Sequence, residues 1–142
     1  MAVIKLYSNT NADSPQQALV RNEIDPTPVA FPDAVKGDFN SYHLFLVAGD
    51  GTFDTDATAD IASILGGVGT LGGTALASTT VWAVSAGGFL GAISYGGGSV
   101  SSALGTSDFL SAYFEMRLTY TSTSYAHTTF QAPHKIWNRV NT

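Results

Sequence analysis

The middle of this chain carries no formal charge, and that feature constrains its fold and surface more than any other. Residues 61–107 contain no Asp, Glu, Lys or Arg. Across the whole chain 12% of residues are charged, against about 25% in ordinary soluble domains. Such a segment either faces other protein or stays hydrated through its Gly, Ser and Thr residues. The sequence leaves both interpretations open.

Glycines are concentrated in this uncharged segment. Twelve of the fifteen lie between Gly66 and Gly105, so the backbone there is expected to turn often. We predict a short strand at Ile61–Leu65, followed by a long loop over residues 66–78. The runs Val81–Ser85 and Phe89–Tyr95 predict a hairpin, because glycines separate two β-forming segments.

Ser99–Leu104 is expected to form a short helix, with a serine cap before apolar residues at helical spacing. Ser111–Tyr120 is the clearest strand, because apolar and polar residues alternate along it. On its polar face we expect Glu115 and Arg117 to pair. A turn at residues 121–124 then predicts two further strands, Ala126–Phe130 and His134–Val140, on either side of Pro133.

The first part of the chain is proline-rich. Residues 1–35 contain four of the five prolines, Pro15, Pro26, Pro28 and Pro32, and each proline removes a backbone donor and fixes φ. We predict an extended arm here that docks on a neighbouring subunit, with room for short strands at Val3–Tyr7 and Val29–Phe31. After it, Tyr42–Val47 predicts a buried strand, which ends at the turn sequence Gly49-Asp50-Gly51.

Together these patterns predict an all-β fold, an antiparallel β-sandwich of about seven or eight short strands with one short helix. At 142 residues the chain fits a single domain, residues 1–142, with the arm at 1–35 and the sandwich at 36–142.

Charge and cysteine content exclude several classes of function. The net charge is −5, and the six Lys and Arg residues are scattered, so direct nucleic-acid binding is not expected. The absence of cysteine excludes disulfides and thiolate metal sites. The N-terminus lacks the pattern of a signal peptide, and the longest mostly apolar stretch, Val81–Ile93, is too short to span a bilayer. We expect a soluble protein with no membrane partner.

Two motifs point weakly to ligands. Gly67, Gly69 and Gly72 match the dinucleotide-binding glycine pattern, but no helix or acidic residue is expected at the required distance. We therefore expect no cofactor. The acidic cluster contains Asp50, Asp54, Asp56 and Asp60. It departs from a calcium-binding loop at the glycine and glutamate positions, so a solvated turn is expected, with cation binding left as the alternative.

No catalytic site is expected. The three histidines, His43, His127 and His134, lack metalloprotease spacing, and no nucleophile-elbow motif surrounds a serine. The two glutamates are Glu23, in the arm, and Glu115, beside Arg117. A guanidinium favours the ionised carboxylate, which does not suit a general acid. Six aromatic residues could line a sugar-binding face, although strand aromatics usually belong to the core: Tyr42, Trp82, Phe89, Tyr95, Tyr113 and Trp137.

The order of several short segments carries a family resemblance. It rests on Gly37-Asp38 before a β run, Asp50-Gly51, Trp82 before residues 87–91, Ser99–Leu104, the Ser111–Glu115 strand, and Thr129–Pro133 leading to Ile136 and Asn138. Over Gly37–Val140 the chain looks like the small β-sandwich domains of bacteriophage virion proteins, similar to the N-terminal domain of baseplate upper proteins and to head-fibre and decoration proteins. Such domains attach to the particle and form symmetric assemblies, often trimers.

This resemblance implies a non-enzymatic structural component of the virion, with capsid or tail subunits as partners and homo-oligomers as the expected state. Tail members of the family continue into a long fibre or receptor-binding region, whereas this sequence ends two residues after Val140. We therefore expect a capsid decoration, head-fibre or tail-baseplate adaptor role. The alternative from another class is a carbohydrate-binding β-sandwich module.

Overall fold

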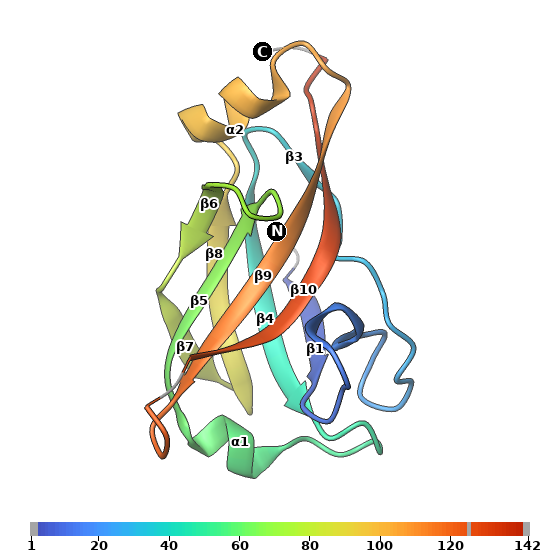
Figure 1. Cartoon of the computed structure of the whole chain (residues 1–142), viewed down its shortest axis with the longest axis vertical. Coiled ribbons are helices and arrows are strands. Elements are labelled where there is room, and N and C mark those ends of the chain that lie inside the picture. Colours follow the sequence, from blue (N-terminus) through green and yellow to red (C-terminus); the bar gives the residue numbers. More distant parts are fainter. Residues whose placement is uncertain (1–2, 125, 141–142) are drawn as a thin grey trace.

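The computed structural model describes residues 3–124 and 126–140 and consists of two facing β-sheets (Figure 1). The first sheet has the order β2-β1-β4-β8-β7 and the second the order β3-β10-β9-β5-β6. The strands of the first sheet are β1 (Ile4–Asn9), β2 (Leu19–Val20), β4 (Phe39–Val47), β7 (Trp82–Ser85) and β8 (Gly88–Ser94). Those of the second are β3 (Ala34–Val35), β5 (Ile61–Gly69), β6 (Ala75–Thr79), β9 (Phe109–Tyr120) and β10 (Ala126–Trp137). The prediction of an all-β sandwich is confirmed.

Most neighbouring strands are antiparallel, but two pairs are parallel: β1 with β4, and β3 with β10. Both involve strands of the N-terminal segment: β1 matches the strand predicted at Val3–Tyr7, whereas β3 is not predicted and lies beyond the strand expected at Val29–Phe31. The parallel pairing corrects the expectation of a purely antiparallel sandwich. Parallel neighbours need a crossover of a dozen or more residues. Residues 10–38 supply that crossover between β1 and β4.

The core lies between the sheets and follows the alternation predicted for β9. Phe114, Met116 and Leu118 are completely buried on its inner face. On the outer face, Arg117 Nε lies 3.6 Å from Glu115 Oε1, as the sequence predicts. The β7–β8 hairpin also forms where predicted, and Phe89 on β8 is buried in the same core.

The N-terminal segment is part of the sandwich, which corrects the prediction of a separate arm at residues 1–35. β1 lies inside the first sheet, between β2 and β4. Phe31 is buried and stacks on Phe114 of the second sheet, with ring centroids 3.8 Å apart. Its amide also donates to the carbonyl of Pro133 at 2.8 Å. Prolines remove backbone donors but leave the chain extended, so this segment can still supply strands and a core side chain.

The glycine-rich stretch is mostly strand, which corrects the prediction of a loop over residues 66–78. β5 continues through Gly66 and Gly67 to Gly69, and β6 follows after a short turn. A Cβ at Gly66 would lie 2.7 Å from Cζ2 of Trp82, and one at Gly91 would lie 2.5 Å from Cε3 of the same ring. These two glycines make room for an indole between the sheets; they are not turn residues.

The last two predicted strands are one strand, β10, which runs through Pro133. The carbonyl of Pro133 accepts a hydrogen bond from Phe31. Because the N and C=O of a strand residue point to the same side, the donor that proline lacks would have pointed away from β9. The pairing between β9 and β10 therefore loses nothing at this position.

Two α-helices connect the strands. The predicted helix is confirmed as α2 (Gly98–Leu104), although Gly97 precedes it and provides no side-chain cap. The other, α1 (Thr55–Ala59), is not predicted; Asp54 caps it by accepting from the Ala57 amide at 2.9 Å. A 3-10 turn, η1, spans Pro15–Gln17.

Candidate functional site

One side of the sandwich is built entirely from the uncharged segment. The last strands of the two sheets on that side are β6 and β7, and their neighbours β5 and β8 come from the same segment. They lie together at the left of Figure 1, opposite the blue N-terminal segment. We call this the uncharged side and the opposite one the N-terminal side.

The two sides differ in how their edge strands are protected. On the N-terminal side, β2 is bridged to the proline-rich segment through Val20 and Pro28, and the Val29 amide donates to Leu19 at 2.9 Å. On the uncharged side, residues 75–85 contain neither a charge nor a proline. Charges and prolines are the usual protection of an exposed sheet edge, so the edge strands of the uncharged side lack this protection.

Val84 shows the consequence. In β7 it pairs directly with Phe89 of β8, which is buried in the core. Directly opposed residues of an antiparallel pair share one face of the sheet, so Val84 lies on the inner face. It is nevertheless 76% exposed, because the second sheet does not cover it. Leu19, an inner residue of the edge strand β2, is 2% exposed.

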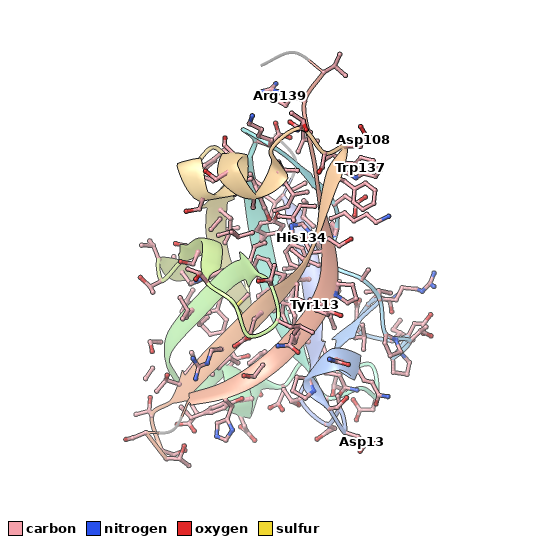
Figure 2. All side chains as sticks on the ribbon, turned by 45° about the horizontal axis from the view of Figure 1, so that its top comes forward. Asp13, Asp108, Tyr113, His134, Trp137 and Arg139 are labelled. Carbon is pink, nitrogen blue, oxygen red and sulfur yellow. The ribbon has the colours of Figure 1, made fainter. Side chains whose placement is uncertain are left out.

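A groove lies on the outer face of the second sheet, next to the turn between β5 and β6. It has a volume of about 410 Å³ and is lined by residues of β5, β6, β9 and β10 and by the turn. Gly67 and Gly69 are among its lining residues, and Tyr113 stands beside the turn in Figure 2. These glycines let β6 approach β5 closely, since a Cβ at Gly67 would lie 2.9 Å from Cβ of Ser78 and one at Gly69 would lie 3.1 Å from the Thr74 carbonyl oxygen.

Polar groups converge in this groove. Glu115 lies directly opposite Gly67 on one neighbouring strand and Gln131 on the other. Its carboxylate accepts from Gln131 Nε2 at 3.4 Å and pairs with Arg117. The side chain of Glu115 is 39% exposed and that of Arg117 50% exposed, so both retain free hydrogen-bonding capacity.

A second polar cluster is buried and joins the two sheets. The hydroxyls of Tyr42 and Tyr95 lie 2.8 Å apart, and His134 Nε2 lies 3.1 Å from the Tyr95 hydroxyl. Burial lowers the pKa of His134 to about 4, although nearby Asp33 opposes this shift. Burial also raises the pKa of both tyrosines, so they stay neutral. With no opening to solvent, this cluster holds the sheets together and offers no reaction site.

The acidic residues serve separate local roles. Asp50 accepts from the Thr52 amide at 3.0 Å, Asp54 accepts from the Thr10 hydroxyl at 2.8 Å in addition to capping α1, and Asp60 accepts from the Ser122 amide at 2.9 Å. Within residues 3–124 and 126–140, no three His, Cys, Asp or Glu side chains come together as a metal site would require.

The other candidate residues are dispersed. His43 contacts the Ser85 carbonyl at 2.8 Å, and His127 packs edge-on against Tyr120. The Gly67 and Gly69 pattern lies in a strand followed by another strand, and therefore does not form the dinucleotide motif. Glu23 interacts with Tyr7, far along the chain from Glu115.

The six aromatic candidates fall into two groups. Tyr42, Phe89 and Tyr95 are buried in the core, as expected, and Trp82 is half-buried between the sheets. Tyr113 faces the groove. Trp137 is 39% exposed on the surface and donates to Asp33 at 2.9 Å. The core assignment is therefore wrong for Tyr113 and Trp137.

Neither Val84 nor the groove is predicted from the sequence. A signal for the groove does exist in the sequence, since Leu65, Gly67 and Gly69 alternate with inner residues at the period of a strand. The exposure of Val84 has no such signal, because it depends on where the second sheet ends.

Among the residues that the structure describes, no helix is long and apolar enough to cross a membrane. No protein-family model matches the sequence, and no curated protein matches it either.

Proposed function

We propose that this protein is a structural component of a bacteriophage particle, either a capsid decoration protein, a head fibre or a tail-baseplate adaptor. It acts by associating with copies of itself and with neighbouring capsid or tail subunits, and it is not an enzyme. Its place is the virion. The phage assignment rests on the resemblance of Gly37–Val140 to virion β-sandwich domains.

The observation that supports association most directly is the exposure of Val84. An inner-face valine on an unprotected edge strand leaves apolar surface and backbone donors in water. Val81, on the same uncharged side, is 78% exposed. If another protein covers this side, the apolar surface and the backbone donors are no longer exposed to water.

A second copy of the chain is the occupant that the charges favour. The chain has a net charge of −5, so two copies repel each other where their acidic surfaces meet. The uncharged side offers the approach with the least repulsion. A basic partner would instead be attracted to the acidic residues outside residues 61–107. Given the family resemblance, a trimer is the expected assembly.

Sedimentation velocity of the purified chain tests this proposal. We expect the unmodified protein to form a discrete oligomer. Val84→Lys should shift it to the monomer, because a lysine charge would be buried at the contact. Ile24→Lys is the matched control, since Ile24 is 74% exposed on the N-terminal side and Val84 is 76% exposed. A monomer at every concentration, or equal effects of the two lysines, would contradict association through the uncharged side.

The phage assignment needs a separate measurement. Mass spectrometry of purified particles, produced from the genome that encodes this chain, should detect the protein at a fixed ratio to the major capsid protein. Its absence from the particles would refute the virion role even if the protein forms oligomers.

A further inference from the structure

The groove on the second sheet has the shape and the chemistry of a ligand site. Its volume of about 410 Å³ is within the range of small-molecule pockets, roughly 300–1,000 Å³. Gly67 and Gly69 face outward on β5 at the edge of the groove, where β6 approaches closely, and polar side chains of β9 and β10 line the rest of it. Leu71, on the turn beside it, is 55% exposed. Apolar surface therefore borders the polar side chains.

The charges in the groove cancel. Arg117 lies 3.6 Å from Glu115, so the groove presents one cation and one anion with no net charge. A phosphate would be repelled by Glu115, and a cation by Arg117. The chain's net charge of −5 further disfavours an anion. A ligand suited to this groove is neutral and rich in groups that both donate and accept hydrogen bonds.

The placement of the polar groups fits vicinal hydroxyls. The guanidinium supplies several donors, the carboxylate supplies acceptors, and the Gln131 amide supplies both. All three side chains line the groove. Tyr113 adds an aromatic ring with a hydroxyl at its edge, a combination suited to a molecule with one apolar and one polar face.

We propose that this groove binds a neutral saccharide. The sugar's C–H face lies against the ring of Tyr113, and its hydroxyls bond to Glu115, Arg117 and Gln131.

The experiment is an NMR titration of the full ¹⁵N-labelled chain with cellobiose, maltose, lactose and chitobiose, with inorganic phosphate as the charged comparison. We expect at least one saccharide to shift the amide signals of Gly67, Gly69 and Tyr113 in a saturable way, and phosphate to leave them unchanged. Glu115→Gln should weaken binding about tenfold, the loss expected for a charge-assisted hydrogen bond. Tyr113→Ala should weaken it about fivefold.

Glu23→Gln is the matched control, because Glu23 is the chain's other glutamate and lies outside the groove; it should leave the affinity unchanged. Four results would overturn the proposal: no saturable shift with any of the saccharides, shifts caused by phosphate instead, equal losses for Glu115→Gln and Glu23→Gln, or groove signals that move with protein concentration alone. The last result would assign the groove to a second copy of the chain.

This inference is independent of the proposed association. Val84→Lys should leave saccharide binding intact, and Glu115→Gln should leave the sedimentation of the protein unchanged. Either proposal can fail while the other stands.

Discussion

The two sides of this sandwich end their sheets in opposite ways. On the N-terminal side, a proline-rich segment bridges β2, supplies β1 and β3, and inserts Phe31 into the core. On the uncharged side, β7 ends the first sheet and leaves the inner-face residue Val84 exposed. On the N-terminal side, the chain itself covers the inner face of the edge strand. On the uncharged side, no part of the described chain covers the inner face at Val84.

This difference shows that composition alone does not identify which surface the fold leaves uncovered. The prolines of the N-terminal segment suggest an arm for binding neighbours, yet the chain uses that segment to close its own fold. The uncharged middle of the chain forms the surface on which an inner-face residue, Val84, remains exposed. Deleting residues 1–33 would therefore remove β1 and Phe31 and unfold the protein, so loss of particle association in such a variant would say nothing about docking.

The largest expected effect tests how firmly the N-terminal side is closed. Phe31→Ala removes a buried ring that stacks on Phe114 at 3.8 Å and should lower the free energy of unfolding by about 3–5 kcal/mol. Urea denaturation followed by circular dichroism measures this loss. A loss below about 1 kcal/mol would mean that the segment is only loosely attached, as an arm would be.

A somewhat smaller effect should appear as a dependence on pH. His134 packs edge-on against Phe31, and burial lowers its pKa from the ordinary 6.5 to about 4. The unfolded chain therefore takes up a proton first as the pH falls. Stability should be full above pH 6.5 and should decline by about 3 kcal/mol towards pH 4.

Melting temperatures of the unmodified protein and His134→Gln, recorded between pH 7 and pH 4, separate this contribution from that of the carboxylates. The variant should lose less stability over the interval. Identical pH profiles for the two proteins would show that burial does not keep His134 neutral in the folded protein.

The smallest expected effect is that of a substitution at the edge strand β7, which can be compared with one at the opposite edge strand, β2. Val84→Ala should lower the stability of the dilute monomer by less than about 0.5 kcal/mol, because the side chain is already in water. Leu19→Ala, at the inner face of the opposite edge strand, should cost about 2–5 kcal/mol. Urea titrations at low and high protein concentration measure the free energy of unfolding of both variants. If Val84→Ala costs as much as Leu19→Ala in the monomer, the two sides are equally covered.

Local patterns predict the parts of the fold that depend on local sequence. The alternation in β9 gives its strand, its faces and the Glu115–Arg117 pair correctly, and glycines between β-forming runs give the β7–β8 hairpin. Patterns of this kind work because a half-buried strand must place apolar residues at every second position.

The remaining features depend on residues distant in sequence. Gly66 resembles a loop residue until the ring of Trp82 is placed against it. Phe31 is a core residue because rings distant in the sequence, Phe114 and His134 among them, pack around it. The groove depends on Gly67 and Glu115 being opposite each other in neighbouring strands. Strand register across the sheet, which one sequence does not specify, decides each of these cases.

The chain's two tryptophans give the molecule a pair of built-in optical reporters. Trp82 lies between the sheets on the uncharged side, held by a hydrogen bond from its indole to the Thr79 carbonyl at 3.1 Å. Trp137 lies at the end of β10 and is bonded to Asp33 of the N-terminal segment. Since the two indoles sit in different surroundings, variants that keep only one of them would give the two sides separate fluorescence signals.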